Sequence, residues 1–379
     1  MINSNRLAEK FTMLAEIDSI SKEEGKIAQK LANILRNMGA DVSFDDAGKR
    51  VGGDTGNLIA KFKGNVNADP IFLSGHMDTV EPGRGVKVIF EDGVFKSDGT
   101  TILGSDDKSA LAIILEVMET ILEKKLPCPP VEIVFTICEE IGLRGAKAFD
   151  LSFLNSKSGY ILDSTETDGI VTKAPFANRI TIKVFGRDAH AGANPENGIN
   201  AISIASKAIS TLDLGRIDHE TTCNLGKIKG GKASNIIPDF VVINGEARSH
   251  DETKLENIID KIINAFYDAA DYYRTDKNDL PRIEAIVKQD FPGTNIPEDH
   301  EIVRLAKKAA ANIGKNMECK TIGGGADANI FFGRGVVSGV LGTGMTDVHT
   351  IRESIKLKDM EDAAELLLEI VKIRATGDL

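Results

Sequence analysis

A buried strand that ends in two adjacent carboxylates is the strongest constraint in this sequence. Residues 131–138 form an apolar run rich in β-branched and aromatic side chains, bounded by prolines 129–130 and by Gly142, which is typical of a buried strand. Glu139 and Glu140 follow. Two carboxylates at the end of such a strand are costly unless a positive charge lies between them. They indicate a metal ion at the carboxyl end of a sheet, with two solvated loop residues as the ordinary alternative.

The composition indicates a globular protein of two domains. A chain of 379 residues exceeds the size at which a single core stops growing. The net charge of -11 and the lack of a Lys/Arg-rich block argue against a nucleic-acid partner. The sequence has no signal-peptide pattern, no apolar run of membrane-spanning length and no CxxC spacing among its four cysteines. We therefore expect a cytoplasmic protein with reduced thiols and no membrane association.

Alternating strand and helix patterns predict an α/β fold with a mainly parallel sheet covered by helices. Over residues 179–287 the pattern changes to the β-α-β-β-α-β order of ferredoxin-like domains. We therefore predict a discontinuous metal-binding domain over residues 1–176 and 292–379, interrupted by an α+β domain over residues 177–291. Within the first domain, the Ser-Lys-Glu-Glu sequence at residues 21–24 predicts a capping box that opens a helix.

Further ligand-type residues stand at another strand end. His76 and Asp78 follow a strand predicted over residues 71–74, and because residues i and i+2 of an extended chain share a face, both can point into one cavity. His76 suits a metal ligand. Asp78 could bind metal too, but we favour an outer position in which it orients the imidazole and raises its basicity. The alternative is a surface His-Asp pair, a spacing that is common by chance.

Three more segments complete a candidate ligand set. Asp106 and Asp107 follow a Gly-containing loop and open a helix. We interpret Asp107 as the N-cap and Asp106 as a carboxylate able to bridge two cations. Asp163 ends a short strand, and His349 lies in a polar loop near the C-terminus. One histidine, one terminal carboxylate and one shared carboxylate per ion would form a two-metal site, and such ligands without thiolate fit Zn²⁺, with Co²⁺ or Mn²⁺ also suitable.

The order of these segments resembles the M20 family of metallopeptidases, and within it the peptidase T (tripeptidase) branch. The resemblance covers nearly the whole chain and rests on SGHMDTV (residues 74–80), SDGTTILGSDDKSA (97–110), TICEEIGLRGA (136–146), ILDS (161–164), FGRDAHAG (185–192), ASNIIP (233–238) and GMTDVHT (344–350). It implies a zinc-exopeptidase-like catalytic domain with an inserted lid domain, through which two copies form a homodimer.

The resemblance also implies a role for each residue of the metal site. Glu139 would be the general base, which takes a proton from a metal-activated water and passes it to the leaving amine. Asp78 would orient His76, and the peptide bond after the bridging aspartate would be cis. The implied ligands of the two zinc ions are His76 and Asp163 for one, Glu140 and His349 for the other, and Asp106 as the bridge.

Candidate substrate-binding residues lie mainly in the predicted inserted domain. The resemblance implies that His190 stabilises the tetrahedral oxyanion, often across a dimer; by itself it would be read as a surface histidine. Arg248 and Asn235 resemble residues that hold a substrate carboxylate, and a guanidinium suits that planar anion. Gly324, within a run of three glycines, could offer a backbone N–H to the same anion, although such runs are usually turns.

Several functions are compatible with these motifs. The first is an exopeptidase for short peptides, specifically a tripeptide aminopeptidase. The second is an amidohydrolase of the same fold that deacylates N-acyl amino acids, and a carboxypeptidase or dipeptidase would use the same metals and base. A non-catalytic relative is disfavoured by the complete ligand set and by the presence of Glu139. A co-catalytic aminopeptidase of another family is disfavoured by the insertion between Asp163 and His349.

Overall fold

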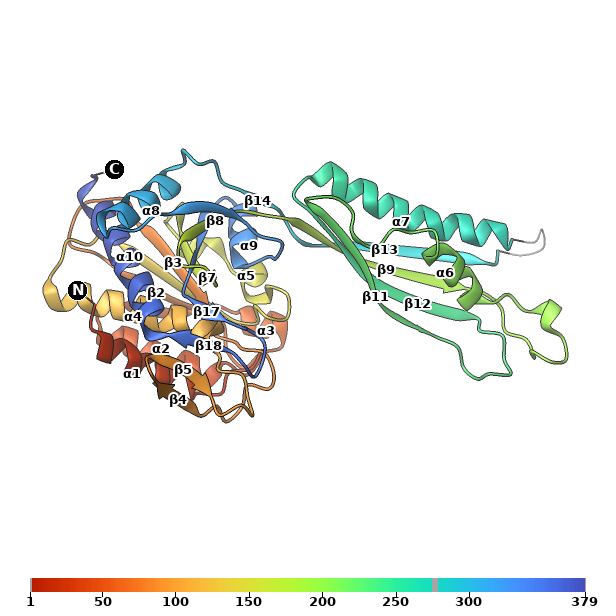
Figure 1. Ribbon diagram of the computed structural model, residues 1–379, viewed down its shortest axis with the longest axis horizontal. Coiled ribbons are helices and arrows are strands. Elements are labelled where there is room, and N and C mark those ends of the chain that lie inside the picture. Colours follow the sequence, from red (N-terminus) through yellow and green to blue (C-terminus); the bar gives the residue numbers. More distant parts are fainter. Residues whose placement is uncertain (1, 275–278, 379) are drawn as a thin grey trace. The chain divides into compact units, whose positions relative to one another are not determined.

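The computed structural model describes residues 2–274 and 279–378, which form two compact units (Figure 1). Unit 1 is made from both ends of the chain, up to Lys173 and from Thr294 onward, and unit 2 is the intervening segment Ala174–Gly293. Each unit has its own hydrophobic core. Among the helices of the described residues, none has both the length and the apolar character needed to cross a bilayer.

Unit 1 is built on one large sheet. In spatial order its strands are β1 (Asp41–Phe44), β2 (Leu58–Phe62), β6 (Val131–Thr136), β3 (Ile71–His76), β7 (Ser158–Ser164), β16 (Val337–Gly342), β8 (Gly169–Ala174) and β14 (Thr294–Asn295), with β15 (Glu318–Thr321) beside β8. The central pairs β6–β3, β3–β7 and β7–β16 are parallel, whereas β1–β2, β2–β6 and β16–β8 are antiparallel. The predicted mainly parallel sheet is therefore confirmed.

Parallel pairing brings the ends of three strands together. His76, the last residue of β3, pairs with Thr136, the last residue of β6. Ser74 pairs with Ile161 of β7, so Asp163 and His76 each lie two residues beyond that pair on neighbouring strands. The residues that follow β6 and β3 consequently meet at the carboxyl edge of the sheet, where α/β folds place their sites.

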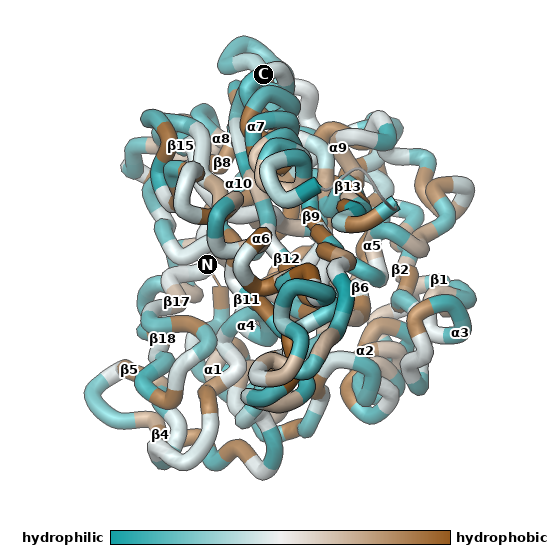
Figure 2. The backbone as a smooth tube through the Cα atoms, turned by 90° about the vertical axis from the view of Figure 1, so that its right-hand side faces the viewer, coloured by the Kyte–Doolittle hydropathy of each residue, from teal (hydrophilic) through white to brown (hydrophobic). Residues whose placement is uncertain are grey.

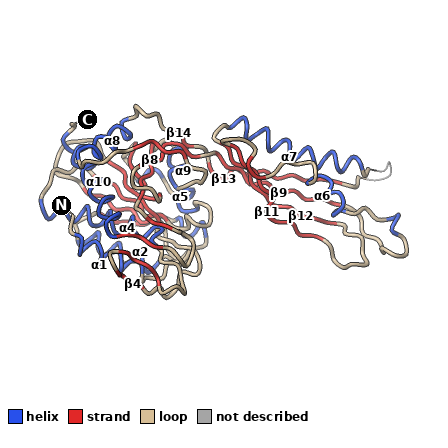
Figure 3. The backbone as a smooth tube through the Cα atoms, in the orientation of Figure 1, coloured by secondary structure: helices blue, strands red, loops and turns tan. Residues whose placement is uncertain are grey.

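Helices flank this sheet, as Figure 3 shows. Helix α4 (Ser105–Lys124) is buried over most of its surface and packs against β3 and β7 as well as against α1 (Ser4–Ala15) and α10 (Leu357–Thr376). A small separate sheet in the order β17 (Met345–Thr346), β18 (Ser354–Lys356), β5 (Val94–Ser97), β4 (Val88–Glu91) joins the C-terminal part of the chain to the segment before α4. The helices are α1 (Ser4–Ala15), α2 (Gly25–Asn37), α3 (Ala47–Val51), α4 (Ser105–Lys124), α5 (Arg144–Ala148), α8 (Glu301–Asn312), α9 (Asp327–Gly333) and α10 (Leu357–Thr376), with a 3₁₀ turn at Leu151–Phe153.

Unit 2 has the predicted β-α-β-β-α-β order. Its antiparallel sheet has the spatial order β10 (Gly215–Arg216), β11 (Thr221–Gly230), β12 (Phe240–Ser249), β9 (Phe176–Phe185), β13 (Arg282–Phe291). Helices α6 (Ala201–Ile209) and α7 (Glu252–Tyr272) complete it, with a 3₁₀ turn at Pro195–Asn197. Ile180, Ile182 and Val184 alternate along β9 and join the helices in one core, and β9 and β12 carry much of the brown, hydrophobic colour in Figure 2.

Candidate metal centre

The structure brings the predicted metal ligands of unit 1 together at the carboxyl edge of the sheet. The ligand atoms of His76, Asp106 and Glu140 lie within 4.8 Å of one another. Those of Asp106, Asp107 and Asp163 form a second group of the same size. Because Asp106 belongs to both groups, it lies at the centre of the cluster. These residues come from β3, the start of α4, the loop after β6, and β7.

Asp106 lies between two imidazoles. Its Oδ1 is 3.0 Å from His76 Nε2, and its Oδ2 is 3.1 Å from His349 Nε2. His349 Nε2 is also 3.0 Å from Glu140 Oε1. Since the two oxygens of one carboxylate each face a different imidazole, Asp106 has the geometry of a ligand shared by two cations, each of which would also contact one histidine. The peptide bond between Asp106 and Asp107 is cis, as the resemblance implies.

The close approach of α4 to β3 determines where Asp107 points. A Cβ atom at Gly75 would lie 2.8 Å from Asp107 Oδ2 and 2.9 Å from the Cβ of Ala110, so only glycine allows this approach. Asp107 Oδ2 accepts a hydrogen bond from the His76 backbone N–H at 3.0 Å. The prediction that Asp107 is the N-cap is therefore wrong. Gly104 takes the N-cap position, and the Asp107 carboxylate faces the metal cluster instead.

Asp78 holds the histidine and both glutamates in place. It is fully buried, and its Oδ1 accepts the backbone N–H of Glu139 at 2.8 Å and lies 3.4 Å from His76 Nδ1. Its Oδ2 accepts the Ser21 hydroxyl at 2.6 Å and the Glu140 backbone N–H at 3.2 Å. Its backbone carbonyl is 2.9 Å from His76 Nδ1. These contacts occupy the Asp78 carboxylate. Asp78 contacts the Nδ1 side of the His76 ring, whereas Asp106 faces Nε2.

The capping box predicted at residues 21–24 is wrong, and two of its residues contact the metal site instead. Helix α2 begins at Gly25 without a side-chain cap. The Ser21 hydroxyl donates to Asp78, and buried Glu24 accepts the backbone N–H of Cys138 at 2.9 Å. Cys138 has a positive φ of 53°, so this hydrogen bond holds a strained residue just before the two glutamates. Neither role could be predicted from the sequence, because the same four residues also fit a local helix start.

The cluster contains far more carboxylate side chains than cationic side chains. Burial raises the pKa of Glu139, Asp163 and Asp107 well above their ordinary values, and neighbouring carboxylates raise each of them further. The hydrogen bond with Asp106 is the main reason that the pKa of His349 rises to about 10. Excess negative charge of this kind is what a pair of divalent cations would neutralise.

A buried oxygen atom of Asp107 tests whether metal ions suit these residues. Asp107 Oδ1 has no hydrogen-bond partner among the described residues, and the same holds for Asp327 Oδ1, although Asp327 belongs to neither group of candidate ligands. Asp327 is 2% exposed, its Oδ2 accepts the Thr136 hydroxyl at 2.5 Å, and burial raises its pKa to about 6. The orphaned oxygen of Asp107, a residue grouped with Asp106 and Asp163, fits a hard or borderline divalent cation. The burial of Asp327 could not be predicted from the sequence, although this residue closes the glycine-rich segment that contains Gly324.

Unit 2 places His190 and Asn235 side by side. His190 forms a bridge with Ile236, and the Ala191 N–H donates to the Asn235 carbonyl at 2.9 Å. The His190 side chain is exposed, and its Nδ1 accepts the backbone N–H groups of Gly192 and Ala193 at 3.1 and 3.2 Å. A neutral imidazole that accepts at Nδ1 carries its proton on Nε2. His190 therefore presents an N–H donor to its surroundings, as an oxyanion ligand must.

Arg248 does not lie near these two residues within unit 2. Arg248 pairs with Ala177 at the start of β9, whereas the His190 segment continues the pairing of Phe185 with Phe240 at the other end. Phe240 and Arg248 are separated by about 26 Å along β12, at ~3.3 Å per residue. Arg248 is 30% exposed, and its guanidinium donates to Glu246 Oε2 at 3.1 Å. One copy of unit 2 therefore holds two separate groups of candidate residues.

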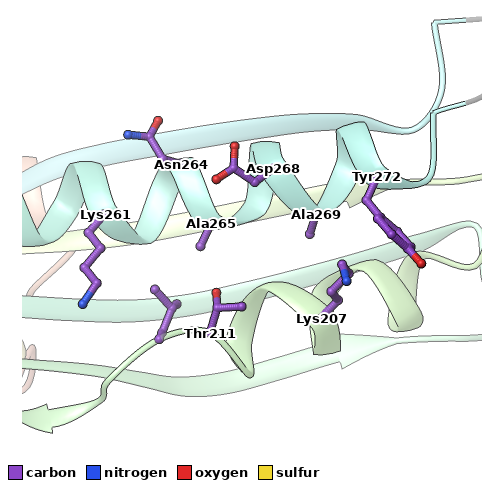
Figure 4. A pocket seen from close by; sticks show the side chains of 9 residues that line it. Lys207, Thr211, Lys261, Asn264, Ala265, Asp268, Ala269 and Tyr272 are labelled. Carbon is purple, nitrogen blue, oxygen red and sulfur yellow. The ribbon is translucent and has the colours of Figure 1, made fainter.

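Gly324 is exposed between β15 and α9, and a Cβ atom there would meet no other atom within 4 Å. The role of its backbone N–H in binding an anion stays a prediction. Unit 2 also has a groove of about 500 Å³ between α6 and α7 (Figure 4), where Lys207 Nζ lies 3.9 Å from the centre of the Tyr272 ring. The lining of that groove includes none of the predicted site residues.

Known proteins resemble this chain over its whole length. Residues 72–373 match the model of peptidase family M20/M25/M40. An uncharacterised protein of Bacillus subtilis, YqjE, is 42% identical and covers 98% of this chain and 99% of its own. The crystal structure of aminopeptidase PepT from Bacillus cereus has a TM-score of 0.90 at 38% identity, covering 99% of each chain. A tripeptidase of Staphylococcus aureus has a TM-score of 0.93 at 37% identity, covering 99% of this chain and 100% of its own. The chain therefore belongs to peptidase family M20/M25/M40 and is a peptidase T-like hydrolase of peptide bonds.

Proposed function

We propose that the protein is a di-zinc exopeptidase that removes the N-terminal residue of tripeptides. The observation that carries this proposal is the position of the Asp106 carboxylate, which directs one oxygen to His76 and the other to His349. The similar structures of full length are an aminopeptidase and a tripeptidase. That similarity favours short peptides over N-acyl amino acids as substrates.

The division of the ligands between the two ions is the one that the resemblance to the M20 family implies, and the shared position of Asp106 in both groups of candidate ligands supports it. His76 and Asp163 would hold one zinc ion, and Glu140 and His349 the other, with Asp106 between them; Co²⁺ and Mn²⁺ suit the same donors. Two such ions, when bound, would lower the pKa of water and polarise the scissile carbonyl. Each of these residues belongs to unit 1.

Glu139 is the proposed general base. Asp78 fixes its backbone through the 2.8 Å hydrogen bond to the Glu139 N–H, so the carboxylate starts from a rigid position. In the proposed reaction the Glu139 carboxylate takes the proton of the attacking water and delivers it to the nitrogen of the leaving amine. Asp78 also holds the His76 imidazole, so one buried carboxylate orients both a ligand and the base.

A substrate series tests this function. The zinc-loaded protein should hydrolyse tripeptides with a free N-terminus faster than dipeptides, tetrapeptides, N-acetylated tripeptides or N-acetyl amino acids. Preference for N-acetyl amino acids would establish the deacylase alternative. Release of the C-terminal residue from tripeptides, or fastest cleavage of dipeptides, would establish a carboxypeptidase or a dipeptidase. Product analysis by mass spectrometry separates these outcomes, because each releases a different fragment.

We further propose that His190 and Arg248 act on the same substrate from two copies of the chain. The two residues lie at opposite ends of the unit 2 sheet. Phe240 and Arg248 are about 26 Å apart along β12, and the segment of His190 continues beyond Phe240. An extended tripeptide spans only about 11 Å. If Arg248 binds the substrate carboxylate and His190 binds the oxyanion, one copy cannot supply both. This supports a homodimer as the active form.

Mixing two inactive variants should restore activity if His190 acts across the dimer. His190→Ala should lower kcat by about 10²- to 10³-fold, the usual loss for one oxyanion donor. Mixed with inactive Glu139→Gln protein, it should form heterodimers with one intact site, and activity should recover after subunit exchange. Exchange is verified with two affinity tags. No recovery in exchanged dimers would contradict a role of His190 in the partner's site.

A further inference from the structure

Glu353 joins the two segments that carry Asp106 and His349. Its side chain is 1% exposed and receives four hydrogen bonds from the start of α4. Oε2 accepts the backbone N–H groups of Leu103 and Gly104, each at 2.9 Å. Oε1 accepts the Ser105 hydroxyl at 2.6 Å and the backbone N–H of Asp106 at 3.0 Å. The carboxylate thus holds the backbone of Asp106 itself.

The same glutamate anchors the loop of His349. It lies four residues after His349, its own backbone N–H donates to the Thr350 carbonyl at 3.1 Å, and the next residue, Ser354, begins β18. His349 has a positive φ of 64°, which an L-residue seldom adopts unless its surroundings hold it there. Glu353 therefore ties a strained histidine loop to a segment almost 250 residues earlier in the chain.

We propose that Glu353 is a positioning residue of the metal centre. It sets the distance between Asp106 and His349, and thereby allows one carboxylate to face two imidazoles. The inference rests on the proposed function only in taking Asp106 and His349 as metal ligands. A displacement of the Asp106 backbone would move Oδ1 and Oδ2 away from His76 and His349 together, so metal affinity should depend on Glu353.

Unit 1 supplies a matched control in Glu132. This residue is 3% exposed and its carboxylate accepts the backbone N–H groups of Asn155 and Ser156 and the Ser156 hydroxyl, between 2.7 and 3.1 Å. It lies near the start of β6, whereas Glu139 and Glu140 follow the end of that strand. Glu132 also accepts the Asn155 side-chain NH₂ at 2.9 Å and lies 3.4 Å from Lys61 Nζ. Both glutamates are thus buried and accept backbone N–H groups and a serine hydroxyl, and of the two only Glu353 accepts a hydrogen bond from a proposed metal ligand.

The test compares Glu353→Gln with Glu132→Gln. In either variant the new amide NH₂, a hydrogen-bond donor, faces a backbone N–H or a serine hydroxyl that donated to the carboxylate. Because two facing donors cannot form a hydrogen bond, both variants should lose thermal stability. Zn²⁺ affinity is measured by competition with a chromophoric chelator, without any peptide. Glu353→Gln should weaken zinc binding by about 10- to 100-fold, as loss of an outer hydrogen-bond partner of metal ligands typically does. Glu132→Gln should leave zinc affinity unchanged.

Unchanged zinc affinity in Glu353→Gln, or an equal loss in Glu132→Gln, would overturn the proposal. If Glu353→Gln does not fold, Ser105→Ala removes one of the four donors and should weaken zinc binding in a folded protein; unchanged affinity would again overturn it. Failure of the peptidase function would be distinguishable, because zinc affinity is measured independently of turnover. Excess Zn²⁺ should also restore kcat in Glu353→Gln, whereas Glu132→Gln, with a similar loss of thermal stability, should reach full kcat at the zinc concentration that saturates the unmodified protein.

Discussion

Glutamine in place of Glu139 should lower kcat by about 10²- to 10⁴-fold, the usual contribution of a positioned general base, and should leave both metal ions bound. The substitution preserves size and the backbone hydrogen bond from the residue 139 N–H to Asp78. The amide cannot accept a proton from the attacking water near neutral pH. Steady-state kinetics with a tripeptide and metal content per chain, measured on the same sample, check both parts of this expectation.

Glu140→Gln is the matched control, because it changes the adjacent residue of the same loop in the same way. Glu140 Oε1 lies 3.0 Å from His349 Nε2, so here the amide replaces a proposed charged ligand and should reduce metal affinity. Near-normal kcat in Glu139→Gln would exclude Glu139 as the base. Equal loss of metal from both variants would show that the two adjacent glutamates do not have separate roles.

The core of this site could be predicted from sequence because it depends on sheet geometry. His76 and Glu139 each follow a strand whose apolar pattern is plain, and parallel strands of one sheet must end at the same edge. The pairing of His76 with Thr136 and of Ser74 with Ile161 confirms that rule here. No knowledge of side-chain packing was needed to expect these residues to meet.

The supporting residues could not be predicted, since their partners are distant in the chain. Ser21 and Glu24 fit a local capping box as well as they fit any distant role, and only the fold shows that they contact Asp78 and Cys138. Glu353 follows His349 by four residues, yet its four donors lie near residue 104. A charged residue in a polar loop gives no sign of such burial.

Asp107 shows a related difficulty at close range. An aspartate at the start of a helix is usually an N-cap, and that interpretation failed because the Asp107 carboxylate accepts the backbone N–H of His76 and not an N–H of its own helix. The non-helical backbone of Asp106 and Asp107 turns both carboxylates toward β3, where Gly75 leaves the space. Local residue preference predicted the helix correctly but not the conformation of its first residues.

Asparagine in place of Asp106 should have the largest effect on metal binding. Asp106 Oδ1 and Oδ2 lie 3.0 and 3.1 Å from the Nε2 atoms of His76 and His349, so the residue is the proposed ligand of both ions. Asparagine has one oxygen, no charge and an NH₂ group that cannot coordinate a cation. Zinc affinity should fall by more than about 100-fold, since loss of an outer partner alone costs ~10- to 100-fold, and both ions should be lost together.

Asp327→Asn is the control for burial and charge. Asp327 is 2% exposed and thus no less buried than Asp106 at 8%, but it belongs to neither group of candidate ligands, so Asp327→Asn should leave two ions bound per chain. Isothermal titration with Zn²⁺ gives the number of sites in each variant. A single remaining site of normal affinity in Asp106→Asn would show that Asp106 serves one ion only, because a shared carboxylate cannot be removed from one ion without removing it from the other.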